Sequence, residues 1–302
     1  MSDIKSNIYA QKVELLLRLI PIVMEEDVFA IHGGTAINLF LKNLPRYSVD
    51  IDLTYIPLAD RQTSLDDISI LLKSIAEKAK KAFKGMHIVP NFGTSKLLCE
   101  YRGKQVKIEV NQTKRGIVGG VVQTLPLSEK AQDEFSLFCE ANVVPLTQLY
   151  GGKIAALSRQ HPRDLFDVRY MEIPLSECRE GLIFCLLGSD RPIYESFAPR
   201  LIDQREAMEN QFAGMTDVPF SYEEFEDTRA KLISEVKTLM TEADKMFLIG
   251  FESGQPEWDG YEFEYFKDYP SVQWKLLNLN KLAKQNPQKL HEEVERLKRL
   301  FL

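Results

Sequence analysis

The feature that most constrains this chain is one stretch near its N-terminus, IHGGTAINLFLKNLPRYSVDIDLT at residues 31–54. Gly33 and Gly34 predict a tight turn, because glycine adopts backbone conformations that other residues avoid and leaves room for a ligand beside the main chain. The apolar residues after the turn predict a short buried helix, which Thr35 can cap and Pro45 ends. The stretch is therefore predicted to run from a glycine turn through a helix into a strand.

Two aspartates lie on that strand. The segment SVDIDL at residues 48–53 alternates polar and apolar side chains, so Asp50 and Asp52 share one face. Neighbouring carboxylates repel each other unless a cation lies between them, whereas free N–H groups at a turn before a helix attract phosphate. The pattern predicts a nucleoside triphosphate held by the turn, with its magnesium ion held by the aspartates. The simpler interpretation is an ordinary turn and an edge strand with two solvated aspartates.

The composition is that of a soluble globular protein. The chain has 302 residues, 44% of them hydrophobic and 27% charged, which is enough for two modest domains. With a formal net charge of −6, any nucleic acid would have to bind a local basic patch. The four cysteines are scattered without CxxC pairs, so neither a zinc site nor a disulfide framework is indicated. No signal peptide or membrane span is recognisable, and we expect a cytoplasmic protein that does not bind membranes.

The first part of the chain predicts a sheet flanked by helices. Helices are predicted at residues 7–24 and 66–83, and strands at residues 28–31, 48–53, 87–90, 95–101 and 105–111. Arg102-Gly103-Lys104 is a turn between the last two strands, which makes them an antiparallel hairpin. We expect an α+β fold with a mixed or antiparallel sheet in a domain of residues 1–144, followed by a helical domain of residues 145–302 that completes the active-site cleft.

A second group of polar residues is predicted on two consecutive helices in TQLYGGKIAALSRQHPRDLFDVRY, at residues 147–170. Its paired glycines and alanines allow another backbone or a bound nucleotide to come close. Pro162 begins the second helix. Lys153 on the first helix can neutralise a triphosphate, or it can be an ordinary surface lysine. Asp164 can stabilise the dipole of its own helix, and Asp167 can pair with Arg163 one turn away.

The remaining chain is predicted to be helical, with helices at residues 178–187, 193–198, 220–247, 274–282 and 289–301. A capping box, Ser221-Tyr222-Glu223-Glu224, opens the longest of them. An acidic loop at residues 251–269 carries several aromatic residues, among them Trp258. They could stack on bases, but the surrounding acids favour packing against the helices.

Taken together, HGGTAINLF, RYSVDIDL and LYGGKIAALSRQHPRDLFDV resemble the AbiEii/AbiGii (MenT-like) family of nucleotidyltransferase toxins in the DNA polymerase β-like nucleotidyltransferase superfamily. The resemblance runs over most of the chain and includes PSVQWKLLNLNKL at residues 270–282. It implies the toxin half of a type IV toxin–antitoxin or abortive-infection system. It also implies transfer of nucleotides from an NTP to an RNA 3′ end with Mg²⁺ or Mn²⁺, and a block of translation.

The resemblance assigns roles to residues of this chain. The phosphate turn corresponds to Gly33, Gly34 and Thr35, the metal ligands to Asp50 and Asp52, the triphosphate lysine to Lys153, and an RD-x-x-D group to Arg163, Asp164 and Asp167. Whether Asp164 or Asp167 is the essential acid is left open. The family implies a tRNA as the acceptor and a cognate antitoxin, expected to be of the winged-helix type.

Three residues near the turn keep alternative interpretations. Ser48 can contact phosphate or the first carboxylate, or be a simple strand serine, and His32 can be an acid–base group or a packed turn residue. Members of the superfamily place a third carboxylate on a neighbouring antiparallel strand, and Glu109 is the acid of the last strand predicted here. Glu109 can complete a two-metal cluster or activate the attacking hydroxyl, or it can form a cross-strand ion pair on a solvated face.

We therefore expect a Mg²⁺-dependent nucleotidyltransferase that acts on RNA. Two alternatives use the same turn and aspartates. One is an NTP-dependent phosphotransferase that moves the γ-phosphate, and the other is a non-catalytic nucleotide-binding module.

Overall fold

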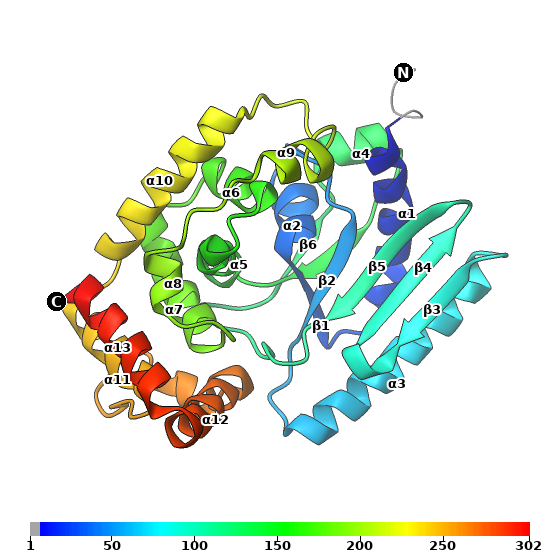
Figure 1. Ribbon diagram of the computed structural model, residues 1–302. Helices are drawn as coiled ribbons and strands as arrows, with labels where there is room; N and C mark the ends of the chain where they lie inside the picture. Colours follow the sequence, from blue (N-terminus) through cyan, green and yellow to red (C-terminus); the bar gives the residue numbers. More distant parts are fainter. Residues whose placement is uncertain (1–6) are drawn as a thin grey trace. The chain divides into compact units, whose positions relative to one another are not determined.

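The computed structural model describes residues 7–302, and the chain folds as two units (Figure 1). The first unit runs to Pro145 and also contains Phe212–Pro219. The second unit consists of Leu146–Gln211 and Phe220–Leu302. The sequence predicted a single division between residues 144 and 145, with no return of a later segment to the first unit.

The returning segment is held by hydrogen bonds to the loop before the aspartate strand. Tyr47 donates its backbone N–H to the carbonyl oxygen of Met215 at 2.6 Å. The hydroxyl of Thr216 donates to the carbonyl oxygen of Pro45 at 2.7 Å. Both contacts join residues that are far apart in the sequence, and no local pattern predicts them.

The first unit is built on a mixed seven-stranded sheet with the order β3-β4-β5-β2-β1-β7-β6. In chain order its strands are β1 (Phe29–His32), β2 (Asp50–Tyr55), β3 (His87–Asn91), β4 (Lys96–Tyr101), β5 (Lys104–Val110), β6 (Gln123–Pro126) and β7 (Glu140–Val143). Strands β2 and β5 pair in parallel, as do β1 and β7, and the other neighbours are antiparallel. The predicted α+β fold with a mixed sheet is confirmed.

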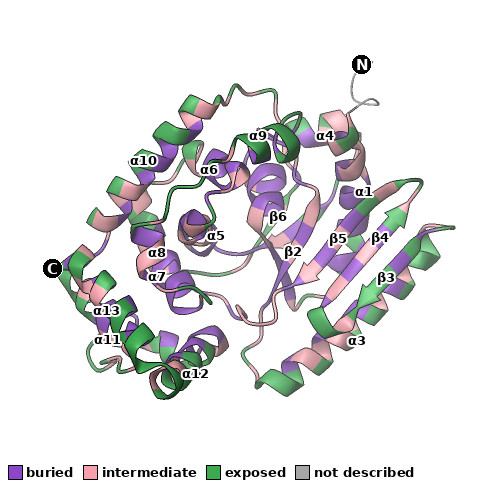
Figure 2. Ribbon diagram, in the orientation of Figure 1, coloured by how far each residue is buried: buried purple, intermediate pink, exposed green. Residues whose placement is uncertain are grey.

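The two faces of the sheet differ in chemistry. Ile31, Leu53 and Ile108 are 0% exposed and belong to the apolar face, against which helices α1 and α3 pack (Figures 1 and 2). Asp52 and Glu109 alternate with these residues along β2 and β5, so they lie on the opposite, polar face. The sheet thus separates the core of the unit from its charged side chains.

Side-chain caps mark the starts of helices α1 and α3 in the first unit. These helices are α1 (Ile8–Val23), α2 (Gly33–Thr35), the π-helix η1 (Ala36–Leu41), α3 (Arg61–Ala82), the 3₁₀ helix η2 (Phe92–Thr94) and α4 (Glu129–Phe135). Asn7 caps α1 by accepting from the N–H groups of Tyr9 and Ala10. The start predicted for α3 at residue 66 is wrong, because Asp60 caps the helix earlier by accepting from Thr63 N–H.

The second unit is helical, as predicted. Its elements are α5 (Leu146–Ala155), η3 (Ala156–Ser158), α6 (Pro162–Arg169), η4 (Leu175–Cys178), α7 (Arg179–Leu187), α8 (Tyr194–Phe197), α9 (Arg205–Gln211), α10 (Tyr222–Thr238), α11 (Glu242–Glu252), η5 (Glu264–Asp268), α12 (Pro270–Gln285) and α13 (Pro287–Phe301). None of the helices within residues 7–302 combines the length and hydrophobicity that crossing a membrane requires.

The single helix predicted over residues 220–247 is wrong, because two helices cover this segment. The predicted capping box of Ser221 and Glu224 does open α10. A second capping box, formed by Thr241 and Asp244, opens α11. The loop that follows packs its aromatic rings inward, as the acids around it suggested: the ring of Tyr261 stacks on Phe247 with 3.8 Å between centroids.

Glycines bring the backbones of α5 and α7 into direct contact. A Cβ atom added to Gly151 would lie 2.3 Å from the carbonyl carbon of Gly181. A Cβ atom added to Gly181 would lie 2.0 Å from the carbonyl oxygen of Thr147. Of the two explanations that the sequence allowed for these small residues, the structure shows the approach of another backbone at Gly151.

We predict that Gly151→Ala destabilises the second unit by about 1–3 kcal/mol, because neither backbone can yield without opening the α5–α7 contact. Gly152→Ala is the matched control, since its Cβ atom would meet only the sulfur of Cys185 at 3.7 Å, and alanine favours the helix. Both tryptophans of the chain, Trp258 and Trp274, belong to this unit. Urea unfolding followed by tryptophan fluorescence therefore reports on it, and equal midpoints for the two variants would contradict the prediction.

Candidate active site

The glycine turn follows β1 directly and forms the short helix α2 together with Thr35. Gly33 adopts a φ angle of +73°, which favours glycine. A Cβ atom at this position would also lie 3.0 Å from Oδ2 of Asp52. The carboxylate of Asp52 therefore lies directly against the turn, and Gly33 is required both for the backbone conformation and for the space. His32, the residue before the turn, is hydrogen-bonded through Nδ1 to the hydroxyl of Thr54 at 3.0 Å.

Thr35 ties the turn to the start of the aspartate strand. Its Oγ1 atom lies 2.5 Å from the carbonyl oxygen of Asp50 and 3.1 Å from Oγ of Ser48. The carbonyl can only accept, so the threonine proton goes to Asp50 and the Ser48 hydroxyl can donate to Thr35. The predicted capping role of Thr35 is wrong, because its backbone is already helical and no side-chain cap bond forms. Both hydroxyls instead form hydrogen bonds that link the turn to the start of β2.

Arg46 is a residue of this site that the sequence analysis did not single out. A Cβ atom at Gly34 would lie 2.6 Å from Nη2 of Arg46 and 2.8 Å from Oγ of Ser48. The guanidinium is 3% exposed and also donates to the carbonyl oxygen of Tyr47. Gly34 therefore makes room for a buried cation beside the turn. The signal was present in the segment RYSVDIDL, where a cation lies four residues before the first aspartate.

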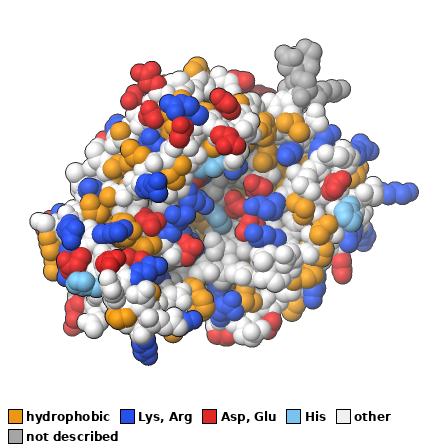
Figure 3. All heavy atoms as spheres, viewed as in Figure 1, with side chains coloured by type: hydrophobic (Ala, Val, Ile, Leu, Met, Phe, Trp, Pro, Cys, Tyr) orange, Lys and Arg blue, Asp and Glu red, His pale blue; other side chains and the backbone are white. Residues whose placement is uncertain are grey.

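Asp50 and Asp52 lie on β2 with partly exposed side chains. The parallel register aligns Asp50 with Lys107 and Asp52 with Glu109 on β5. Because aligned residues of neighbouring strands point to the same face, these four charged groups form one cluster. Figure 3 shows acidic and basic side chains gathered over this region of the sheet.

Glu109 is held between two lysines. Its carboxylate lies 2.8 Å from Nζ of Lys107 and 3.0 Å from Nζ of Lys96. Burial alone would raise the pKa of Glu109, but the hydrogen bonds and charges of the two lysines outweigh burial and lower it. The strand that carries Glu109 pairs with β2 in parallel, whereas the family resemblance led us to expect an antiparallel neighbour. The cross-strand ion pair is present, and a role as third metal ligand stays a prediction.

The donor atoms of the site suit a magnesium ion that is bound together with a substrate. Within residues 7–302, no three His, Cys, Asp or Glu side chains come together so that they alone would hold a metal ion. Magnesium commonly takes one or two carboxylates and completes its coordination with water and substrate phosphate oxygens. Asp50 and Asp52, next to a turn that can receive phosphate, fit that mode.

In the second unit, the structure brings Lys153 of α5 together with two aspartates of α6. Nζ of Lys153 lies 2.7 Å from Oδ1 of Asp164 and 2.8 Å from Oδ2 of Asp167. The side chain of Lys153 is 11% exposed and that of Asp167 is 0% exposed, so the interpretation as an ordinary surface lysine is wrong. Asp167 was expected to pair with Arg163, but the structure shows Lys153 as its partner. Arg163 donates its backbone N–H to His161, the capping residue of α6.

The pKa of Asp164 reflects this ion pair. Burial would raise the pKa, but the charges of Lys153 and Arg159 outweigh burial and lower it below the ordinary value of 3.8. Oδ2 of Asp164 lies 3.3 Å from Nη2 of Arg159. Asp164 therefore stays ionised at neutral pH and, by its hydrogen bond, orients the side chain of Lys153.

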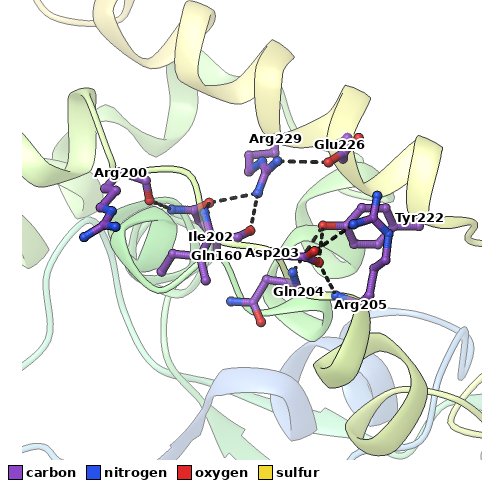
Figure 4. Close-up of polar contacts among 9 residues, drawn as sticks. All are labelled: Gln160, Arg200, Ile202, Asp203, Gln204, Arg205, Tyr222, Glu226 and Arg229. Carbon is purple, nitrogen blue, oxygen red and sulfur yellow. Dashed lines mark hydrogen bonds and ion pairs between the residues drawn. The ribbon is translucent and has the colours of Figure 1, made fainter.

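A separate polar network fixes the start of α6 (Figure 4). Gln160 adopts a φ angle of +52° just before the helix and is 1% exposed. Its amide donates to the carbonyl oxygen of Arg200 at 2.7 Å and accepts from Arg229 at 3.0 Å. Arg229 also donates to the carbonyl oxygen of Ile202 at 2.8 Å. The network thus joins residues 200–202 and helix α10 to Gln160, which immediately precedes the helix that carries Asp164.

Comparisons of the sequence and of the fold relate the chain to known proteins. The family model described as "Nucleotidyl transferase AbiEii toxin, Type IV TA system" matches residues 14–277. Among solved structures, the chain is similar to "MenT4, nucleotidyltransferase toxin Rv2826c from Mycobacterium tuberculosis H37Rv", with a TM-score of 0.58 and 15% sequence identity over 90% of this chain and 93% of that chain. At that identity the likeness shows the fold. No curated protein matches the sequence.

We predict that Asp164→Asn lowers the free energy of unfolding of the second unit by about 2 kcal/mol at pH 7. Because the folded-state pKa of Asp164 is lowered, its contribution is complete above the unfolded value of 3.8 and is lost as the pH falls through the folded value. The difference between variant and wild type should therefore shrink below about pH 4. Tryptophan fluorescence in urea measures it, with the exposed Asp190→Asn as control. A difference that does not change down to pH 3 would exclude the ion pair as its cause.

Proposed function

The chain belongs to the AbiEii family of nucleotidyltransferase toxins of type IV toxin–antitoxin systems, and from this premise we propose that it transfers a nucleoside monophosphate from an NTP to the 3′ end of an RNA. A tRNA is the proposed acceptor, and blocked translation is the proposed consequence. The observation that carries the proposal is the contact between the carboxylate of Asp52 and the glycine turn, 3.0 Å from the position of a Gly33 Cβ atom. Carboxylates and a phosphate-binding turn in contact suit a metal-bound triphosphate.

In the proposed reaction, the oxygen of the RNA 3′-hydroxyl attacks the α-phosphorus of the NTP. The bond between the α-phosphorus and the bridging oxygen breaks on the opposite side, and pyrophosphate leaves with that oxygen. Asp50 and Asp52 would hold a divalent ion, which would supply charge stabilisation for the reacting oxygens. The N–H groups of the turn and the guanidinium of Arg46 add positive potential for the phosphates.

The two lysines around Glu109 affect whether this residue can accept the proton of the RNA 3′-hydroxyl. A general base works best when its pKa lies near the operating pH, whereas Lys107 and Lys96 lower the pKa of Glu109. Glu109 is therefore a poor proton acceptor at neutral pH. We assign the proton to water and leave to Glu109 the role of holding Lys107 beside the aspartates. Metal ligation by Glu109 is the alternative that the family resemblance implies.

Lys153 is proposed to bind the triphosphate, with Asp164 and Asp167 as the groups that hold its ammonium in place. Their carboxylates lie 2.7 Å and 2.8 Å from Nζ, so a bound polyphosphate has to share the ammonium with them. Arg163 lies on α6, as do these two aspartates, and is proposed as a further nucleotide contact. We propose that a cognate antitoxin of the winged-helix type binds the protein. We also propose that the protein acts in the cytoplasm, where NTPs and tRNA occur.

We predict that Asp50→Asn and Asp52→Asn each reduce nucleotide transfer by about 100-fold or more, because each removes a charged metal ligand worth several kcal/mol in the transition state. The purified protein is incubated with total RNA, Mg²⁺ and each NTP labelled at the α-position. Asp66→Asn, an exposed aspartate on α3, is the control and should keep wild-type activity.

Labelling at the γ-position tests the alternatives in the same assay. Label that reaches RNA or protein only from the γ-position would establish a phosphotransferase. Binding of Mg²⁺-NTP in calorimetry without transfer from either position would establish a non-catalytic module. Undiminished α-label transfer by Asp50→Asn would refute the proposed roles of the aspartates.

A further inference from the structure

A lysine lies on the strand next to the two aspartates. Lys107 is aligned with Asp50 in the parallel β2–β5 register, and its Nζ atom lies 2.8 Å from Oε2 of Glu109. The same register aligns Asp52 with Glu109, so the ammonium of Lys107 lies on the face of the sheet that carries all three carboxylates.

Lys96 provides a natural comparison. Its Nζ atom lies 3.0 Å from the other oxygen of Glu109, and its side chain is 41% exposed compared with 36% for Lys107. Lys96 lies on β4, which pairs with β5 on the side away from β2. The two lysines thus share one glutamate and a similar exposure, but only Lys107 is on the strand adjacent to the aspartates.

We propose that Lys107 is the resident counter-charge of the Asp50–Asp52 pair and that it sets how tightly the pair binds a divalent cation. This inference rests on the proposed function, since it concerns the regulation of the same site. Without metal, the ammonium offsets the repulsion between the two carboxylates. A divalent ion bound by the aspartates would be repelled by the same ammonium, and in a partly solvated site we expect this repulsion to weaken the affinity about tenfold.

The counter-charge also couples the metal to the nucleotide. A triphosphate is an anion, and it can take over the ammonium of Lys107 when it binds at the turn. The repulsion that opposes a free metal ion is then replaced by an attraction between the lysine and the ligand. The site therefore favours the metal together with polyphosphate over the metal alone.

Titration of the full-length protein with Mn²⁺, without nucleotide, tests the inference. Free Mn²⁺ is measured by its electron paramagnetic resonance signal. Lys107→Met removes the charge but keeps most of the side chain, and we expect it to bind Mn²⁺ about tenfold more tightly than wild type. Lys96→Met should change the dissociation constant by less than about threefold, because its charge is farther from the aspartates. Asp52→Asn, introduced alone, should weaken Mn²⁺ binding, which would show that the titrated ion binds at the aspartates.

Thermal unfolding in EDTA supplies a readout that does not depend on metal. Lys107→Met should lower the melting temperature more than Lys96→Met does, since only the former leaves the aspartates unbalanced. Equal melting temperatures of the two variants would contradict the inference. If Asp52→Asn weakens Mn²⁺ binding but Lys107→Met binds it no more tightly than wild type or Lys96→Met, the inference is wrong while the metal site stands. If neither wild type nor Lys107→Met binds Mn²⁺, or if the binding does not depend on Asp52, the metal site of the proposed function is wrong as well.

Discussion

The repulsion between two carboxylates on one face of a strand is the constraint around which the first unit is organised. Asp50 and Asp52 cannot move apart, because β2 is a central strand with partners on both sides. Two cations lie near the carboxylates. Lys107 is aligned with Asp50 on one neighbouring strand, and the buried guanidinium of Arg46 lies at the turn. A divalent cation would complete the same compensation, so stability without metal and affinity for metal are opposed at this site.

Much of this unit follows from short-range patterns. Alternating side chains placed Asp50 and Asp52 on one face, and the paired glycines marked the turn. The register that aligns Lys107 with Asp50, and the contact of Arg46 with Gly34, depend on pairing between distant segments. In contrast, the break between α10 and α11 had a local signal, because Thr241 and Asp244 form a capping box of the kind recognised at Ser221 and Glu224. The hydrophobic periodicity of the segment concealed it.

Glycine illustrates why a residue type alone does not assign a role. Gly33 is required by a positive φ angle and by the carboxylate of Asp52, and Gly34 by the guanidinium of Arg46. Gly151 lies in an equally conspicuous pair, yet its missing side chain admits the backbone of α7 at Gly181. A sequence shows that space is needed at such a position. Only the fold shows whether a ligand, a side chain or a helix occupies it.

The ion pairs of Lys153 raise the question of why charges are buried in the helical unit. Breaking one such pair is costly, but replacing a whole buried cluster by apolar residues is often neutral or stabilising. Stability therefore does not explain why Lys153 is placed between Asp164 and Asp167, 11% exposed. On the proposed function, the two carboxylates have another role, because they hold the ammonium in one position before the nucleotide binds. An oriented cation then needs no rearrangement when the triphosphate arrives.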